Sequence, residues 1–314
     1  MLDVNVNIRS PRYPDLDLAL QFLNAPISGS DVHAITDAHQ WHARLMVLGW
    51  GVLIPTGILV ARYFKVLRAQ DWPRQLDNRR WWHAHLALQC TGMVLSLVAL
   101  GLAFFASGAA GSGILPPVGV TVHETLGWAI VTLGLGQVLG GALRGTKGEG
   151  GSSAAAAARR PRRDALVGSP AGDHYLMTAR RCAFEYLHKA SGYLALALSA
   201  INILLGLAIS DAPVWMWIAI PGYWAVLGAV AVALQRQGRC VDTYQAIYGP
   251  DVQLPGNARA PIGWGVRRYE IGQWPPARPA ASRRRARSPA GARAGSPAPV
   301  ERASPFGTGG PVIG

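Results

Sequence analysis

The stretch VHETLGWAIVTLGLGQVLGGALRG, residues 122–145, decides the fold of this chain. It is apolar and long enough to cross a bilayer, since a helix needs roughly 20 residues to span about 30 Å of hydrocarbon. An ionisable side chain, His123, stands at its head. Such a side chain is costly at a membrane span and usually has a function. The stretch therefore predicts a transmembrane helix that carries a functional histidine.

Four further apolar runs of this kind indicate a membrane protein. Half of the 314 residues are apolar and only 15% are charged, against about 25% charged in soluble domains. Backbone groups inside a bilayer must find their hydrogen bonds within the segment, so each run must be a helix. The sequence predicts an all-α membrane protein whose five spans lie at about residues 41–64, 81–106, 120–143, 184–209 and 214–234.

The basic residues gather in alternate loops. The loop of residues 62–80 has six basic side chains against two aspartates, and the third loop contains RRPRR, whereas residues 107–119 carry no charge. By the positive-inside rule, the N-terminus lies outside and the C-terminus lies in the cytoplasm. The net charge of +13 therefore reflects the basic loops and tail expected on the cytoplasmic side of the membrane. We expect membrane lipid as a partner and no nucleic acid.

Composition also divides the chain into parts. Residues 1–40 form a polar N-terminal segment outside, and residues 41–236 form the five-helix domain, with a flexible cytoplasmic loop at 144–183. Residues 237–274 either pack as a small cytoplasmic cap or lie in the headgroup layer. Residues 275–314 are a basic, disordered tail. The N-terminus lacks the pattern of a signal peptide, so we expect the first span to insert by itself.

Three other spans repeat the histidine pattern, with His42, His85 and His188 near their starts. Because successive helices alternate in direction, His42 and His123 start from the outer side, and His85 and His188 start from the cytoplasmic side. Each pair offers two imidazoles from facing helices, which are the axial ligands that six-coordinate b-type haem requires. The pattern predicts two haem b groups, one near each membrane face.

Small residues share the helix face of each of these histidines. Steps of three and four residues lead from His123 to Gly127 and Gly134, and from His188 to Gly192. Small side chains on that face would leave room for a porphyrin. An alternative without a cofactor is that these histidines simply lie at the level of the lipid headgroups. This alternative becomes weaker because four consecutive spans show the same pattern.

The remaining histidines fit the ligand role less well. His83 lies on nearly the opposite helix face from His85 and suits lipid better, so we prefer His85. His39, one turn before His42, is a substitute for it. Two further histidines are expected to be solvated, namely His33 and His174.

Haem propionates need cationic or hydrogen-bonding partners. The sequence offers four candidates, namely Arg44 on the outer side and Arg80, Arg181 and Lys189 on the inner side. Long basic side chains at the ends of spans also reach toward lipid headgroups, and this alternative stays open for each of the four.

Four stretches resemble the cytochrome b561 superfamily, especially the membrane domain of members linked to DOMON domains. These stretches are HARLMVLGWGVLIPTGILVARYFK (42–65), WWHAHLALQ (81–89), HETLGW (123–128) and HKASGYLALALSAINILLGL (188–207). The resemblance implies a four-helix core with two haems, one bound by His42 and His123 and the other by His85 and His188. The chain departs from ascorbate-dependent members, which have six spans, and we find neither their ascorbate-associated motifs nor a DOMON domain before the spans.

The expected function is transmembrane electron transfer between a donor and an acceptor, each a small molecule or a protein. As an enzyme the protein would be an oxidoreductase that reduces ferric iron or another one-electron acceptor. One alternative is a haem-binding membrane anchor that docks a redox partner or the quinol pool, and another is a channel or transporter without haem. We expect an integral protein of a bacterial inner (plasma) membrane, and a homodimer is compatible with these features.

Overall fold

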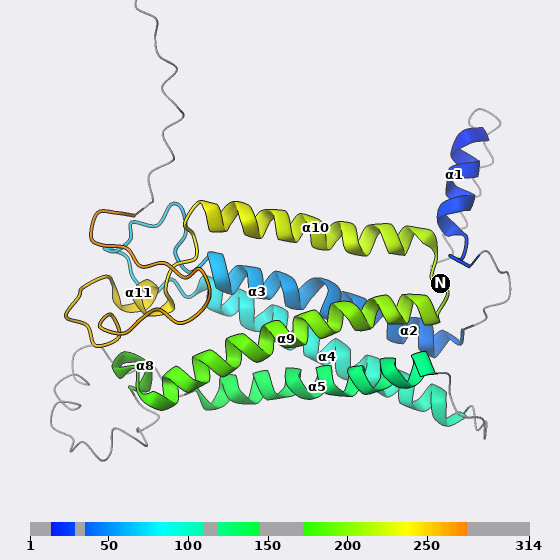
Figure 1. Cartoon of the computed structure of the whole chain (residues 1–314), viewed down its shortest axis with the longest axis horizontal. Helices are drawn as coiled ribbons and strands as arrows, with labels where there is room; N and C mark the ends of the chain where they lie inside the picture. The colour runs from blue at the N-terminus through cyan, green and yellow to red at the C-terminus, as the bar shows by residue number, and fades with distance from the viewer. Residues whose placement is uncertain (1–13, 29–34, 110–117, 145–171, 275–314) are drawn as a thin grey trace, which may run out of the picture. The chain divides into compact units, whose positions relative to one another are not determined.

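The computed structural model describes residues 14–28, 35–109, 118–144 and 172–274, and in these ranges helices joined by irregular segments make up the chain (Figure 1). Five helical segments are long and apolar enough to cross a membrane, at residues 37–63, 80–105, 118–143, 179–209 and 214–236. Each agrees with a predicted span to within five residues at either end. The predicted all-α fold with five candidate spans is confirmed.

Several shorter segments accompany or subdivide these spans. The described helices are α1 (Pro14–Asn24), α2 (Asp37–Met46), η1 (Val47–Leu53), α3 (Ile54–Tyr63), α4 (Arg80–Ala109), α5 (Val118–Leu143), α8 (Asp173–Leu176), α9 (Ala179–Ile209), α10 (Val214–Arg236) and α11 (Thr243–Tyr248). The first span is thus continuous through α2, η1 and α3.

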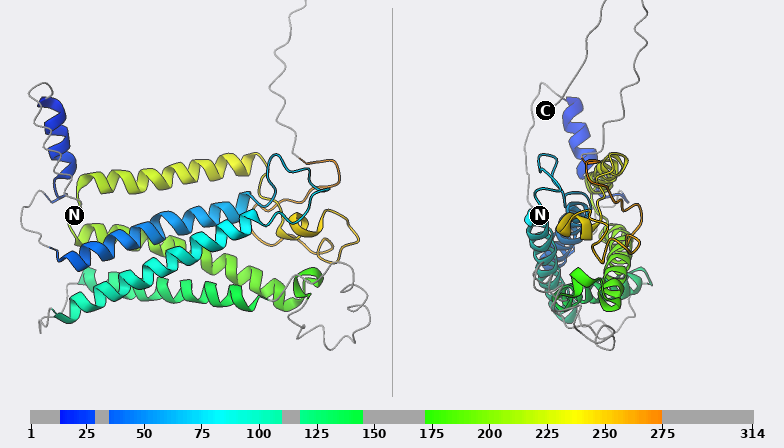
Figure 2. Two further views of the ribbon diagram at one scale, coloured as in Figure 1. Left: turned by 180° about the vertical axis from the view of Figure 1, so that it is seen from behind. Right: turned by 90° about the vertical axis from the view of Figure 1, so that its left-hand side faces the viewer.

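The first four spans form two antiparallel pairs of helices. The first span packs along α4, and α5 packs along α9 (Figures 1 and 2). Contacts of η1 with α9 and of α4 with α5 join the two pairs, and their shared core includes Trp50, Met93 and Ile130. α4 and α9 begin at one end of the bundle, whereas α2 and α5 begin at the other.

The first span changes its winding in the middle. Residues 47–53 form a π-helix, and Pro55 follows directly. Proline has no backbone N–H, so the carbonyl of Gly51, four residues earlier, lacks its α-helical partner. The indole Nε1 of Trp224 on α10 donates to that carbonyl at 2.9 Å. The fifth span is therefore attached to the bundle where the first span is irregular.

The loop of residues 62–80 and the segment 237–274 pack together at the end of the bundle where α4 and α9 begin (Figure 1). Their shared apolar cluster contains Val66, Trp72, Val241, Ala246, Tyr269 and Trp274. Asp242 caps α11 and pairs with Arg268 Nε at 2.6 Å, while the side chain of Gln245 accepts from the backbone N–H of Tyr269 at 2.9 Å. Segment 237–274, which we call the cap, therefore packs against the loop of residues 62–80, whereas its position on the cytoplasmic side stays a prediction.

The end of the third loop is more ordered than expected. α8 lies at residues 173–176, and α9 begins at Ala179, five residues before the predicted span. The expectation that His174 is solvated is wrong, because its side chain is 4% exposed and lies against the rings of Tyr244 and Tyr248. Local sequence does not show that the cap folds over this segment. Predictions about His33, the uncharged outer loop at 110–117, the low-complexity run at 145–171 and the tail fall outside the described residues.

Candidate functional site

His42 and His123 meet between the two helix pairs. His42 lies on α2 and His123 on α5, and their ring centroids are 6.2 Å apart with an interplanar angle of 77°. Each histidine lies within about two turns of the start of its span, so both belong to the same end of the bundle. The structure brings together the two rings that the sequence predicted as the outer ligand pair, while their role as ligands stays a prediction.

Three of the four candidate histidines contact a backbone carbonyl through Nδ1. The contacts are His42 to Ala99 at 2.9 Å, His85 to Gly57 at 3.0 Å, and His123 to Asn202 at 3.2 Å. A carbonyl oxygen only accepts, so Nδ1 must carry the proton, and in the neutral ring Nε2 keeps its lone pair. This is the tautomer in which imidazole can bind a metal through Nε2, with its orientation fixed by the carbonyl.

These carbonyl contacts lie within the helix pairs rather than between them. Ala99 on α4 holds His42 of the first span, and Asn202 on α9 holds His123 of α5. The Nδ1 side of each ring is thus fixed by the helix that packs beside it. Because His42 and His123 belong to different pairs, a group bound by both would connect the two halves of the bundle.

The spacing of the outer pair would allow both rings to hold one metal ion. A metal–imidazole bond is about 2 Å and a ring nitrogen lies roughly 1 Å from its ring centre, so two imidazoles that shared one metal would have centroids about 6 Å apart. The observed separation is 6.2 Å. Gly206 lies beside this pair, where an added Cβ would come within 3.1 Å of His123 Cε1. A larger residue there would push the imidazole away from its position.

His85 and His188 lie near the starts of α4 and α9, at the end of the bundle that carries the cap. The ring of His188 stacks on Phe184 at 5.1 Å, and its Nδ1 is buried without a hydrogen-bond partner among the described residues. A buried polar nitrogen without a partner costs about 1–3 kcal/mol. A buried imidazole nitrogen without a hydrogen-bond partner at this position is compatible with a site that binds a group from outside the chain.

The alternatives to these histidines have other surroundings. His83 is exposed. His39 lies at the start of α2, where its Nδ1 is 2.8 Å from the hydroxyl of Thr36, the residue that caps this helix. His42 and His85, by contrast, are partly buried and each contacts a backbone carbonyl of the neighbouring helix, so they remain the preferred ligands.

Sequence reasoning missed Glu185, which lies one turn before His188. Its carboxylate is 5% exposed and pairs with Arg181 at 3.1 Å and with Lys189 at 2.9 Å. Lys189 also donates to the carbonyl of Ile262 in the cap at 2.8 Å. The available signal was the spacing of four residues on either side of Glu185, which places all three side chains on one helix face.

The four propionate candidates therefore differ in their surroundings. Arg181 and Lys189 already contact the carboxylate of Glu185. Arg44 stacks on the ring of Trp41 at 5.1 Å. Arg80 lines a pocket between α3 and α4, and it lies five residues before His85, which places the two side chains about 140° apart around the helix. Their roles toward a propionate stay predictions.

Five apolar helices, with histidines near both ends of the bundle, place the chain in the class of all-helical membrane proteins. Residues 41–146 match the family model of eukaryotic cytochrome b561. A cytochrome b561 and DOMON domain-containing protein of Arabidopsis thaliana is 28% identical over 195 residues, which is 62% of this chain and 37% of the relative. A second such protein from the same plant is 34% identical over 100 residues, 31% of this chain and 22% of the relative.

The chain spans only about a third of the length of most of these curated relatives. No solved structure gives a significant match. Residues 41–146 are therefore similar to the cytochrome b561 family, and the chain is distantly similar to plant proteins that combine a cytochrome b561 domain with a DOMON domain.

Proposed function

We propose that the protein is a di-haem b-type cytochrome that carries electrons across the membrane. His42 and His123 would hold one haem, and His85 and His188 would hold the other. The observation that carries this proposal is the meeting of His42 and His123 at 6.2 Å, with each Nδ1 occupied by a backbone carbonyl. Similarity to the cytochrome b561 family supports it, because that family implies haem-based electron transfer through membranes.

The two proposed sites lie in series along the bundle. His85 contacts Gly57, fifteen residues after His42 on the same span, so the two sites are about 20 Å apart along the helix axis. Each haem would supply a one-electron iron couple. The chain's own part is to hold both imidazoles of each pair in place during the redox change, which the carbonyl contacts and the packed helix pairs favour.

The basic loop of residues 62–80 and the cap belong on the cytoplasmic side by the charge pattern. This orientation makes the His42–His123 site the outer one and the His85–His188 site the inner one. Arg44 would then be the cation nearest the outer haem propionates, and Arg181 and Lys189 would lie on the inner side.

A redox titration of the visible spectrum tests the ligand assignment. The wild-type protein should show reduced b-type α-bands that titrate as two components. His42→Ala should remove one component and His85→Ala the other, whereas His83→Ala should keep both. A purified protein without these bands would refute the proposal. Loss of the same component in both histidine variants would refute the assignment of the ligands.

The exposed apolar side chains of the cap favour a second candidate function, a haem-binding anchor that docks a redox partner. Val252, Trp264 and Ile271 are each at least 75% exposed on the segment 237–274. An anchor of this kind would bind haem and give the same spectrum, but it would not reduce an acceptor enclosed on the far side of a membrane.

A further inference from the structure

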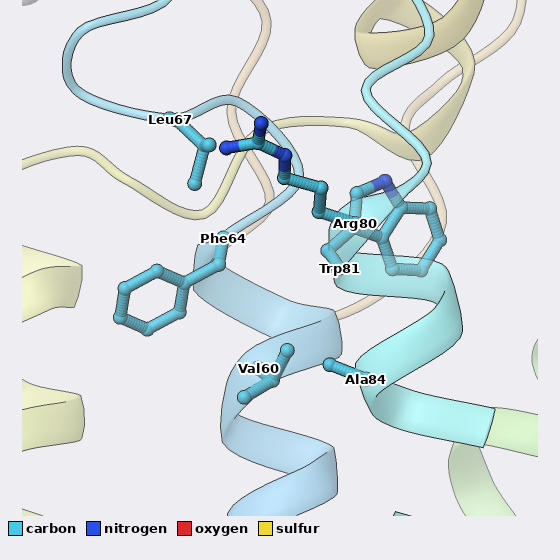
Figure 3. Close-up of a pocket in the computed structure, with 6 residues that line it drawn as sticks. All are labelled: Val60, Phe64, Leu67, Arg80, Trp81 and Ala84. Atoms are coloured by element: carbon cyan, nitrogen blue, oxygen red, sulfur yellow. The ribbon is translucent and has the colours of Figure 1, made fainter. Parts of the chain in front are cut away.

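A pocket of about 200 Å³ lies where the first span ends and α4 begins. The pocket is lined by Val60 on α3, Phe64 directly after α3, Leu67 in the following loop, and Arg80, Trp81 and Ala84 in the first turns of α4 (Figure 3). Val60 and Ala84 face each other between the two helices, and Arg80 extends toward Leu67 above the end of α3. Apart from Arg80 and the indole nitrogen of Trp81, the lining is apolar.

Arg80 is the charged group of this pocket. It is exposed, and among the described residues its guanidinium has neither a carboxylate nor a hydrogen-bond partner, since only its backbone N–H is bonded, to Asn78. It is the first residue of α4, where the helix dipole adds positive potential. Asp71 in the same loop is paired with Arg74. The pocket wall itself is almost entirely apolar, and the unpaired guanidinium of Arg80 lies at its rim, so the site suits an anionic amphiphile.

The volume of the pocket and the side of α4 on which Arg80 lies indicate the kind of ligand that the pocket can bind. Sites that enclose a whole small molecule usually measure about 300–1,000 Å³, so about 200 Å³ holds only part of an elongated molecule. Arg80 leaves α4 about 140° away from His85 around the helix, so this cation is turned away from the histidine side. The remainder of the ligand would lie in the bilayer beside the spans.

We propose that this pocket binds an anionic phospholipid. The phosphate contacts Arg80, and the first part of one acyl chain lies against Val60, Phe64 and Ala84. Trp81 occupies the interfacial level at which tryptophan is enriched in membrane proteins. The basic loop that surrounds the pocket adds the electrostatic attraction that anionic leaflets exert on juxtamembrane cations.

Native mass spectrometry of the full-length protein tests this site. The protein is equilibrated in detergent with an equal mixture of phosphatidylglycerol and phosphatidylcholine, and the retained lipid is counted. The wild type should retain phosphatidylglycerol preferentially. Arg80→Gln should lower that retention about tenfold, as expected for the loss of one charge-assisted hydrogen bond. Arg80→Lys should restore most of it.

Three controls make the test decisive. Arg79→Gln removes the neighbouring arginine, which does not line the pocket, and should leave retention unchanged. Ala84→Phe fills the apolar wall without changing charge and should also reduce retention. Inorganic phosphate at millimolar concentration should not displace the lipid. Thermal melting and circular dichroism establish that each variant is folded.

Equal retention of the two lipids would overturn the proposal, as would an equal loss in Arg79→Gln and Arg80→Gln. Retention that is insensitive to Ala84→Phe but abolished by inorganic phosphate would also overturn it, because the site would then bind a free anion and not a lipid. None of these measurements depends on the presence of haem.

Discussion

At the scale of single residues, Glu185 connects the fourth span to the cap. Burial of a carboxylate is costly unless it is paired and hydrogen-bonded. Arg181 and Lys189 provide that pairing, and Lys189 extends the connection to the carbonyl of Ile262. His188 lies between Glu185 and Lys189 on α9, so the position of its imidazole depends on the same turn of helix.

Glu185→Gln should destabilise the protein by about 3 kcal/mol, because it leaves the buried Arg181 and the partly buried Lys189 without their counter-charge. The measurement is thermal melting of the detergent-solubilised protein followed by tryptophan fluorescence. Glu270→Gln is the matched control, since Glu270 is exposed and bonds only to Gln273 in the described structure. Its change should stay within about 0.5 kcal/mol. Equal shifts for both variants would contradict a structural role for Glu185.

Lys65 should make the stability of the protein depend on pH. Its side chain donates to the carbonyl of Val241, and burial, followed by the nearby charge of Lys189, lowers the pKa of Lys65 from 10.5 to about 8. A lysine whose pKa is lower in the folded protein destabilises the fold when protonated, and this penalty disappears as pH rises above the folded pKa.

The free energy of unfolding should therefore rise by about 2 kcal/mol between pH 8 and pH 9.5. This window ends below the ordinary pKa of tyrosine, so the buried tyrosines of the cap do not obscure it. Fluorescence melting at several pH values measures the change. Lys65→Met should flatten the curve in this window, and an unchanged slope in Lys65→Met would show that another group is responsible.

At the scale of elements, the close packing of the first span on α4 depends on two glycines. An added Cβ on Gly49 would lie 2.9 Å from the carbonyl oxygen of Gly92, and one on Gly92 would lie 2.8 Å from a side-chain carbon of Ile54. Backbone atoms cannot move aside cheaply, so the two helices can approach this closely only if position 49 has no side chain.

Gly49→Leu should force these helices apart and cost about 1–3 kcal/mol through overpacking. Gly136→Leu is the control, because no atom lies within 4 Å of an added Cβ at Gly136. The distance between spin labels on the first span and α4 should increase in Gly49→Leu alone. If both variants melt like the wild type, the two helices are not held by this contact.

The sequence predicted the spans well because apolar runs of bilayer length are a property of each segment alone. The pairing of His42 with His123 was also predictable, since alternating helix direction places their starts at one end. The carbonyl contacts of Ala99, Gly57 and Asn202 were not predictable, because a backbone carbonyl has no signature in sequence. The burial of His174 depends on Tyr244 and Tyr248 of the cap, which follow it in the sequence by 70 residues or more.

At the scale of the whole molecule, the two helix pairs support the central claim. Each proposed haem would be held by one histidine from each pair, so cofactor binding and assembly of the bundle would stabilise each other. The two proposed sites would lie in series, about 20 Å apart along the axis. Loss of either site should therefore interrupt electron transfer completely, although the other site would keep its haem.

Liposomes with an enclosed electron acceptor test this claim most directly. Protein is reconstituted into vesicles that contain ferricyanide, and a membrane-impermeant reductant is added outside. The wild type should reduce the enclosed ferricyanide and His83→Ala should match it, whereas His42→Ala and His85→Ala should each lower the rate to that of protein-free vesicles. A wild-type rate equal to that of empty vesicles, or an undiminished rate in either histidine variant, would contradict electron transfer through two haems in series.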